Sequence, residues 1–353
     1  MDGLTHPRDL EAWDRWHHGH QPLARRLRRT VSVLRDIARP DGRAGEVVVT
    51  RGGPTTRLVV LLESRSPTSV LALLAPLRDL ASLEGVVVVS PVPVRDLLPP
   101  WVWQESRFLS HDAVPRLVRE GEVALSTGHF LPLGRLGREA VADPERFVTV
   151  QHGLMTPHSP PLAEGTTLLA WTDADGAFWR SGRDDVRTTV VGSQLLWDAA
   201  APPPATVDPD ARPVFLGQLH GSELPTAQLA GAAESFCRAE GAAYRPHPVE
   251  TDRRSRATHA RWEAEGISID RSRTPLRELG APVVSVFSTG VLEAAAAGLP
   301  AWVHCPDPPA WLEEFWDRYG LARWGGPATP SPERPRKEPS HTVASVLQGM
   351  MTR

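Results

Sequence analysis

Short runs of consecutive apolar, mostly β-branched residues recur along the chain, separated by segments with helical spacing. Continuous apolar runs of this kind are typical of strands that are buried on both faces of a parallel sheet. In the first two hundred residues the runs lie at 47–49, 58–62, 86–89, 147–150, 168–171 and 189–191, with weaker ones at 108–110 and 123–126. The segment 67–82, which carries Pro76, is expected to be helical. This alternation predicts a doubly wound sheet covered by helices.

The same pattern starts again after a segment that has almost nothing to bury. Residues 198–213 are rich in Ala, Pro and Asp, which is typical of a linker. Beyond them, apolar runs lie at 214–216, 267–269, 283–287 and 301–303, with helices expected near 225–240 and from about 290. The chain is therefore predicted to hold two Rossmann-like domains, over 1–200 and 201–325. A Pro-rich tail with a short C-terminal helix would occupy 326–353.

The N-terminal arm, residues 1–44, is predicted to be helical. Apolar residues at 22–38 recur at helical spacing with arginines between them, as in an amphipathic helix. The preceding tract, Trp16 to His20, holds three histidines. Neighbouring histidines on such an arm rarely share one coordination geometry, so we interpret them as surface residues rather than metal ligands.

Composition excludes several classes of protein. The 353 residues carry 39 basic and 42 acidic side chains, so a net charge of −3 provides no global attraction to nucleic acid or to anionic lipid. Two cysteines, Cys237 and Cys305, cannot form a disulfide framework or a structural zinc site by themselves. No signal peptide and no run of 18 apolar residues is seen, and a cytoplasmic protein is expected.

The segment 283–304 carries the strongest chemical signal. A buried strand ends at Phe287, the small residues Ser288, Thr289 and Gly290 form a turn, and an alanine-rich helix follows. Backbone N–H groups at such a position, beyond the carboxyl end of a parallel strand, can bind phosphate. Glu293, one turn into the helix, could cap the backbone or accept hydrogen bonds from a sugar hydroxyl. An ordinary strand-turn-helix connection is the alternative.

A second signal is the segment Tyr244 to Pro248. Prolines on both sides of His247 hold its backbone extended and place the imidazole on a rigid loop. Arg245 adds a guanidinium that can pair with phosphate. Together these two residues favour a diphosphate-binding site over a purely structural histidine.

In the first domain, the strand at 147–150 is followed by Gln151, His152 and Gly153. A histidine at the carboxyl end of a strand is well placed to be a general base, since its pKa lies near neutrality. His129 follows another strand and is the second candidate. A loop histidine that caps neighbouring backbone is the alternative for His152.

Other motifs carry less weight. Asp173 and Asp175 match the DxD pattern of metal-dependent glycosyltransferases, but they precede a predicted helix, where acidic residues favour the N-terminus. Capping is therefore preferred, and no metal is expected. The sequence has no G-x-S-x-G, no G-x-x-x-x-G-K-[ST] and no G-x-G-x-x-G after a strand, so hydrolase, kinase and dehydrogenase functions lose their usual support.

The order of these motifs resembles a known group of enzymes. Gln151-His152-Gly153, Thr189-Val190-Val191-Gly192-Ser193, Arg245-Pro246-His247-Pro248 and Ser288-Thr289-Gly290-Val291-Leu292-Glu293 are similar to motifs of GT-B-fold transferases of the polysialyltransferase, capsular polysaccharide and CDP-glycerol glycerophosphotransferase kind. The resemblance covers roughly 147–304. It implies two Rossmann-like domains that face a cleft, with His247 and 288–290 on the donor phosphates and His152 near the acceptor.

On this resemblance we expect a metal-independent transferase that needs no cofactor. The donor would be a nucleotide-sugar or a CDP-polyol, and the acceptor a hydroxyl of a glycan, a lipid-linked molecule or a natural product. Peripheral membrane association stays open, and no nucleic-acid partner is expected. Two alternatives remain: a non-hydrolysing UDP-sugar 2-epimerase, which shares the architecture, and a non-catalytic nucleotide-sugar-binding protein.

Overall fold

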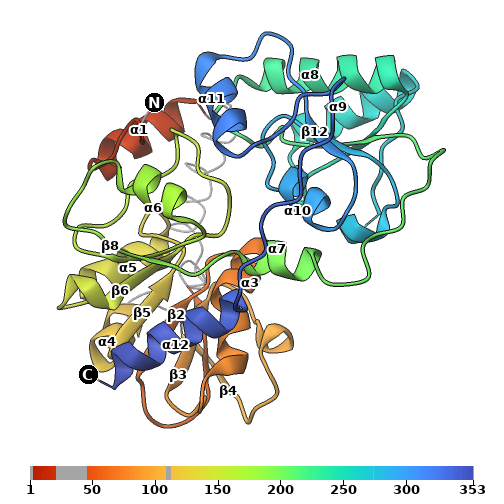
Figure 1. Ribbon diagram of the computed structural model, residues 1–353. Helices are drawn as coiled ribbons and strands as arrows, with labels where there is room; N and C mark the ends of the chain where they lie inside the picture. Colours follow the sequence, from red (N-terminus) through yellow and green to blue (C-terminus); the bar gives the residue numbers. More distant parts are fainter. Residues whose placement is uncertain (1–2, 21–45, 109–112, 273, 353) are drawn as a thin grey trace. The chain divides into compact units, whose positions relative to one another are not determined.

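The computed structural model describes residues 3–20, 46–108, 113–272 and 274–352 (Figure 1). The chain divides into two compact units. Residues 2–194 together with 335–353 form the N-terminal unit, and residues 195–334 form the C-terminal unit. The amphipathic helix predicted at 22–38 lies outside the described residues.

The N-terminal unit contains one eight-stranded sheet. Its strands are β1 (Val47–Arg51), β2 (Leu58–Leu61), β3 (Val86–Ser90), β4 (Gln104–Phe108), β5 (Val123–Ser126), β6 (Phe147–Val150), β7 (Thr167–Ala170) and β8 (Arg187–Val190). Their order is β4-β1-β3-β2-β5-β6-β7-β8, and all neighbours from β3 to β8 are parallel. Because β3 and β5 flank β2 on opposite sides, the strand order reverses at β2, as in a doubly wound fold.

Strand β1 differs from the sequence-based expectation. Its continuous apolar run predicts a parallel strand, but β1 pairs antiparallel with both β3 and β4. Its residues Val47 to Thr50 are nonetheless fully buried or nearly so. A continuous apolar run indicates that both faces of a strand are buried. It does not indicate whether the strand is parallel or antiparallel to its neighbours.

Helices cover both faces of this sheet. They are α1 (Leu10–His20), α3 (Pro67–Leu73), α4 (Ala113–Glu120), α5 (Pro132–Ala140), α6 (Asp173–Arg180) and α12 (Pro339–Met351), with 3-10 turns η1 (Ala75–Asp79), η2 (Arg95–Leu97) and η3 (Pro144–Arg146). Alternate residues of one strand enter different cores: Val86 and Val88 pack with α12, whereas Val87 and Val89 pack with α4 and α5. The helix predicted over 67–82 is interrupted, since α3 ends at Leu73 and a 3-10 turn follows.

The C-terminal helix belongs to the N-terminal unit. In α12, Val343, Ala344 and Leu347 are buried in the core beside β2 and β3, and Ser340 donates a hydrogen bond to Asp79 at 2.8 Å. The sequence places 326–353 in a separate tail and the domain boundary at 200/201. The structure instead divides the chain at 194/195 and returns it to the first unit at 335.

The C-terminal unit has a smaller parallel sheet of the order β10-β9-β11-β12. The strands are β9 (Val214–Leu216), β10 (Ala243–Arg245), β11 (Val283–Ser285) and β12 (Ala301–Val303). Single parallel bridges extend it at both edges, from Ile269 to Tyr244 and from Arg323 to Val303. With these bridges the order along the sheet becomes 3-2-1-4-5-6, the Rossmann order. The strand predicted at 267–269 is thus reduced to one bridge.

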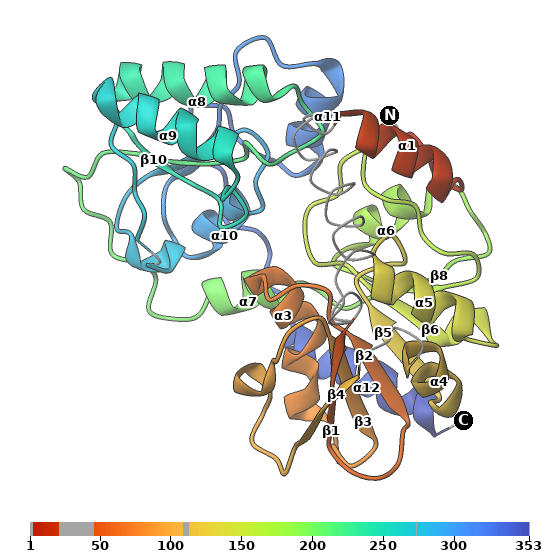
Figure 2. The same ribbon diagram turned by 180° about the vertical axis from the view of Figure 1, so that it is seen from behind.

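The helices of this unit are α8 (Thr226–Glu240), α9 (Arg253–Ala264), α10 (Gly290–Ala296) and α11 (Ala310–Arg318), with a 3-10 turn η4 (Leu276–Glu278); α7 (Gln194–Ala199) spans the division between the units. Figure 2 shows α8 and α9 side by side. Trp262 of α9 donates a hydrogen bond to Glu234 of α8 at 2.8 Å, and its ring meets Tyr244 of β10 edge to face. Two Rossmann-like units in one chain confirm the predicted α/β fold class with two doubly wound sheets.

Within the ranges that the structure describes, no helix is both long and apolar enough to cross a membrane.

Candidate functional site

In the C-terminal unit, the strand order reverses between β9 and β11, and polar side chains gather at that point. The side chain of Gln218, just after β9, joins the two strand ends. Its Oε1 atom accepts a hydrogen bond from the Ser285 hydroxyl at 2.9 Å and another from the Phe287 N–H at 2.9 Å. In doubly wound sheets, ligands bind beyond the carboxyl ends of the strands at this reversal.

A buried carboxylate lies beside it. The side chain of Glu250 is completely shielded from solvent, and it accepts hydrogen bonds from the Leu219 N–H at 2.9 Å, the Tyr244 hydroxyl at 2.9 Å and His259 Nε2 at 3.0 Å. Its Oε1 atom lies 3.8 Å from Nδ1 of His220. Burial alone would raise the pKa of Glu250, but His220, His259 and Tyr244 hold that pKa at about 2. Glu250 is therefore an ionised group at neutral pH.

The missing side chain of Gly217 leaves room for this carboxylate. A Cβ atom on Gly217 would lie 2.4 Å from the Tyr244 hydroxyl oxygen and 2.8 Å from Glu250 Oε1. Both distances are shorter than real contacts of a Cβ atom. Glycine at 217 thus allows β9 to end directly against the Tyr244–Glu250 hydrogen bond.

The two histidines next to Glu250 form a stacked pair. The rings of His220 and His247 have centroids 4.0 Å apart and planes inclined by 26°. Nδ1 of His247 accepts a hydrogen bond from the Val249 N–H at 3.3 Å. Burial, reinforced by His220, lowers the pKa of His247 to about 4. His247 is therefore a neutral imidazole whose remaining proton is on Nε2, where it can be donated.

The predicted phosphate-binding arginine already has protein partners. Arg245 Nη1 donates to Asp270 Oδ2 at 3.3 Å, and Nη2 donates to the Thr274 carbonyl. Its positive charge also reaches Glu293. Burial raises the pKa of Glu293 to about 7, against a smaller lowering effect of Arg245. Glu293 is thus a carboxyl group that is partly protonated at neutral pH and can both donate and accept.

The Ser288–Gly290 turn is formed as the sequence predicts. The Gly290 N–H donates to the Ser288 hydroxyl at 3.1 Å, and α10 begins at Gly290. A Cβ atom on Gly290 would lie 2.5 Å from Leu216 Cδ1, so this turn packs directly against β9. Ser288 and Thr289 are half-buried.

The structure therefore links several predicted residues and adds others. Arg245 and Glu293 interact electrostatically, and Ser288 and Gly290 share one turn. His247 stacks on His220, which the sequence analysis did not name. Their roles as donor-binding residues stay predictions. Three residues that the sequence analysis missed are Gln218, His220 and Glu250. A His placed four residues after a strand, in Gly217-Gln218-Leu219-His220, is the signal that could have indicated the first imidazole.

In the N-terminal unit, the Gln151-His152-Gly153 segment follows β6 as predicted. Gln151 is buried, and its side chain accepts from the Trp171 N–H at 2.8 Å and donates to the Gly153 carbonyl at 3.0 Å. Trp171 in turn donates through Nε1 to the Gln151 carbonyl at 2.9 Å. These bonds fix the loop that carries His152. Burial lowers the pKa of His152 to about 4, so the imidazole is neutral at pH 7.

His129 lies at the strand-order reversal of this sheet, between β2 and β5. It follows Gly128, whose φ of 141° is a backbone conformation that favours glycine. The pKa of His129 is lowered to about 4, mainly by burial and next by the charges of Arg138 and Arg135. The predicted catalytic roles of His129 and His152 stay predictions.

A carboxylate that the sequence analysis missed lies at the same reversal. Glu63, just after β2, accepts a hydrogen bond from the Gly134 N–H at 3.0 Å in the first turn of α5. Burial raises the pKa of Glu63 in spite of that bond. Glu63 thus caps the N-terminus of α5 from a distant part of the sequence. A local sequence pattern cannot predict such a cap.

The aspartates at 173 and 175 begin α6. Thr172 is the N-cap, and its hydroxyl accepts from the Asp175 N–H at 3.0 Å and donates to Asp175 Oδ2 at 2.8 Å. This reciprocal pair is the capping arrangement that the sequence favours over a metal site. In the part of the chain that the structure describes, no group of three or more His, Cys, Asp or Glu side chains is placed to hold a metal ion.

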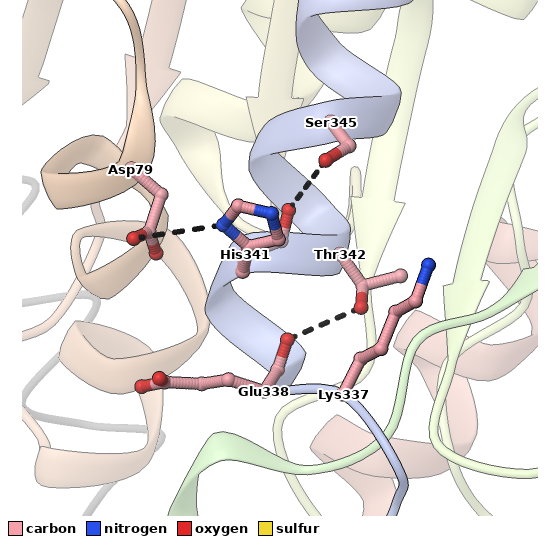
Figure 3. Close-up of a pocket in the computed structure, with 6 residues that line it drawn as sticks. All are labelled: Asp79, Lys337, Glu338, His341, Thr342 and Ser345. Carbon is pink, nitrogen blue, oxygen red and sulfur yellow. Dashed lines mark hydrogen bonds and ion pairs between the residues drawn. The ribbon is translucent and has the colours of Figure 1, made fainter.

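A separate hollow lies between η1 and α12 (Figure 3). It is lined by Asp79, Lys337, Glu338, His341, Thr342 and Ser345. Asp79 and His341 face each other, with Oδ1 and Nδ1 3.9 Å apart. Acidic and basic groups alternate around this hollow, so their charges offset one another and give no preference for an ion of either sign.

Comparison with known proteins gives likeness in structure only. No protein-family model and no curated protein matches the sequence. Among solved structures, the chain is similar to an O-GlcNAc transferase mutant from Thermobaculum terrenum (14% identity, 85% of this chain, 62% of that one, TM-score 0.39). It is also similar to a UDP-GlcNAc 2-epimerase from Methanocaldococcus jannaschii (12%, 83% and 100%, TM-score 0.47). A third is the glycosyltransferase SnogD from Streptomyces nogalater (11%, 85% and 95%, TM-score 0.30).

The chain spans less than two thirds of the length of the first of these structures. At such identities and TM-scores the likeness gives no argument about activity. The fold rests on the strand order of the two sheets, and the function has to be argued from the side chains.

Proposed function

We propose that this protein is a glycosyltransferase-like enzyme that transfers a sugar or a polyol phosphate from a nucleotide-activated donor to a hydroxyl acceptor, without a metal. The C-terminal unit would bind the donor through its phosphates, and the N-terminal unit would supply the base. The order of motifs along the sequence supports this proposal, as does the Rossmann strand order of the C-terminal unit.

The observation that carries the proposal is the group of polar side chains after β9 and β10. A buried, ionised Glu250 lies against His220, which stacks on the neutral His247. Burial of a carboxylate costs free energy, and here three hydrogen-bond donors compensate that cost. Perturbed ionisable groups of this kind concentrate at functional sites, and these lie beside the reversal where doubly wound sheets bind nucleotides.

The chemistry would then need no metal at the leaving group. His247 Nε2–H and the turn at 288–290 would donate hydrogen bonds to the leaving phosphate, which lowers the barrier by stabilising its developing charge. Glu293, partly protonated at neutral pH, is suited to a ribose or sugar hydroxyl. Arg245 adds positive charge to the region, with its guanidinium fixed by Asp270.

In the N-terminal unit, His152 would accept the proton from the acceptor hydroxyl. Its imidazole is neutral at pH 7 and can accept a proton directly, but a pKa of about 4 makes it a weaker base than the sequence-based expectation of a pKa near neutrality. The hydrogen bonds of Gln151 hold its loop in one conformation, as a positioned base requires. His129, equally neutral, is the second candidate.

The direct experiment is a thermal-shift screen with UDP, CDP, CMP, GDP and dTDP. A nucleotide that binds only the folded protein raises its melting temperature by mass action. The proposal predicts a shift with at least one of them, and no shift with any would contradict it.

Incubation with the matching activated sugar then separates the enzyme classes. A transferase releases nucleotide only when an acceptor is present. Conversion of a UDP-sugar into its 2-epimer without acceptor would instead assign the epimerase activity. Binding without any turnover would leave a nucleotide-sugar-binding protein.

A further inference from the structure

We propose that Trp13 of α1 is a positioning residue, which joins the loop of His129 to the loop of His152 and so holds both candidate bases of the N-terminal unit in place. This inference rests on the proposed function, since it concerns the proton acceptor of the same reaction. It assigns a task to the N-terminal helix that no sequence motif indicates.

The two loops leave neighbouring strands of one sheet. The first follows β5 and carries His129 and Phe130, and the second connects β6 to β7 and carries His152 near its start. Because β5 and β6 are parallel neighbours, both loops begin at the same edge of the sheet, the edge at which doubly wound folds bind ligands. A side chain that holds both loops therefore acts on the acceptor side of the proposed reaction.

Trp13 contacts both loops with different parts of its indole. Its ring meets the Phe130 ring edge to face, with centroids 5.6 Å apart. Its Nε1–H donates a hydrogen bond to the His158 carbonyl at 2.8 Å. Only 5% of Trp13 is exposed, so water competes little for either contact. One buried side chain thus joins the neighbour of His129 to the loop that carries His152.

Two further contacts of α1 repeat this connection. Trp16 stacks on the His158 ring, with centroids 4.5 Å apart and planes inclined by 10°. Asp14 accepts a hydrogen bond at 2.7 Å from Arg135 of α5, the helix that follows the His129 loop. The helix α1 is therefore attached to both loops at more than one point.

The loop of His152 is held on both sides of that histidine. Before it, the hydrogen bonds of the Gln151 side chain fix the end of β6. After it, the Thr5 N–H donates to the Pro157 carbonyl at 2.7 Å, and α1 holds the carbonyl of the next residue. Loss of the second attachment should give the His152 imidazole more freedom, and a base that is poorly placed loses rate.

The test compares Trp13→Phe with Trp101→Phe in the full-length protein. Phenylalanine keeps an aromatic ring beside Phe130 but cannot donate to the His158 carbonyl. Trp101 makes a matched bond, from its Nε1 to the Gly52 carbonyl at 2.7 Å, at the opposite edge of the same sheet, where β3 begins. Trp13→Ala, whose folding is checked by circular dichroism, also removes the ring contact.

Hydrogen–deuterium exchange reports on the loops without any substrate. Trp13→Phe should speed the exchange of amides in 152–163 by about tenfold, as expected for loss of one buried hydrogen bond. Trp13→Ala should do so in 128–131 as well. Trp101→Phe should leave both segments as they are in the wild type.

Turnover is measured as nucleotide release with acceptor present, and donor affinity by calorimetry. The kcat of Trp13→Phe should fall by about tenfold, because a misplaced base costs rate. Its donor affinity should equal that of the wild type, since the proposed donor site lies in the C-terminal unit. A residue that only stabilised the fold would lower the melting temperature and leave the kcat of the folded protein unchanged.

The outcomes separate the two proposals. If Trp13→Phe exchanges in 152–163 like the wild type, or turns over like Trp101→Phe, the role of Trp13 is overturned and the proposed function stands. If faster exchange and lower kcat occur together in Trp13→Phe alone, the inference holds. If the wild type transfers nothing, the proposed function falls, and the positioning role falls with it even where the exchange data show that Trp13 joins the loops.

Discussion

The imidazole rings of His220 and His247 stack at 4.0 Å and thereby join the loops that follow β9 and β10. Behind them, Glu250 connects the first ring to Tyr244 and His259. The pair is therefore connected through Glu250 to buried residues. Changes in the packing behind Glu250 should affect ligand binding even where they touch no ligand.

Gly217→Ala tests that connection. The added methyl group would lie 2.4 Å from the Tyr244 hydroxyl oxygen and 2.8 Å from Glu250 Oε1, so both side chains must move away from residue 217. We expect a loss of about 1–3 kcal/mol in the free energy of unfolding, as for an overpacked core, together with weaker nucleotide binding. Urea unfolding and calorimetry measure the two effects.

Gly231→Ala is the matched control for this change. Gly231 lies inside α8, and a Cβ atom there would meet nothing within 4 Å. Alanine should stabilise the helix by up to about 1 kcal/mol and leave nucleotide binding as it is. Equal effects of the two substitutions on binding would show that packing behind Glu250 does not determine the affinity.

His152→Ala tests the proposed base. Turnover should fall by about 10²- to 10⁴-fold, as on loss of a general base, while donor affinity stays unchanged, because His152 lies in the other unit. Initial rates of nucleotide release with acceptor present, compared with calorimetric affinities, separate the two quantities. Wild-type turnover in this variant would leave His129 as the candidate.

Glu293→Gln tests the carboxyl group at the start of α10. The pKa of Glu293 in the fold is about 7, above its ordinary value of 4.5, because the site is buried. The folded state thus favours the protonated form, and stability is lost as pH rises through 7. Glutamine cannot ionise, so the variant should be more stable than the wild type by about 3 kcal/mol near pH 8, with no gain near pH 4.5. A gain of the same size at both pH values would contradict burial of the charge as the cause.

Acidification below about pH 6.5 should destabilise the protein through its buried histidines, while Glu293, whose pKa is about 7, acts in the opposite direction. His129, His152, His158 and His247 all have pKa values lowered to about 4 from 6.5, chiefly by burial. The folded state keeps these rings neutral, so their contribution is complete above about pH 6.5 and is lost as pH falls toward 4. Each should add a slope of about 1.4 kcal/mol per pH unit. Urea unfolding between about pH 5 and 7 measures the total slope, and His129→Gln should reduce it by one such increment; an unchanged slope would contradict the assignment.

The sequence predicts the strands well where both faces of a strand are buried. The runs at 58–62 and 86–89 become β2 and β3, because only strands with both faces covered are apolar throughout. The direction of β1 and the return of α12 to the first unit could not be predicted. Both depend on contacts between segments distant in sequence, such as the hydrogen bond from Ser340 to Asp79.

The residues of the candidate site also fall into those that the local sequence predicts and those that it does not. His247 and the turn at 288–290 were predicted because prolines and small residues impose local backbone geometry. Glu250 was missed because nothing in its local sequence distinguishes it, and for His220 the only local signal is its place four residues after the strand β9. Their significance arises only when β9 and β10 pair and bring Leu219, Tyr244 and Glu250 together.

The account depends on capture of a nucleotide phosphate by the C-terminal unit, and calorimetry on His247→Ala measures this directly. Titration of the full-length wild type with the nucleotide that gives the largest thermal shift should show binding. The variant should bind at least about tenfold more weakly, as expected for loss of a hydrogen bond to a charged group. Equal affinity of wild type and variant for that nucleotide would contradict the account.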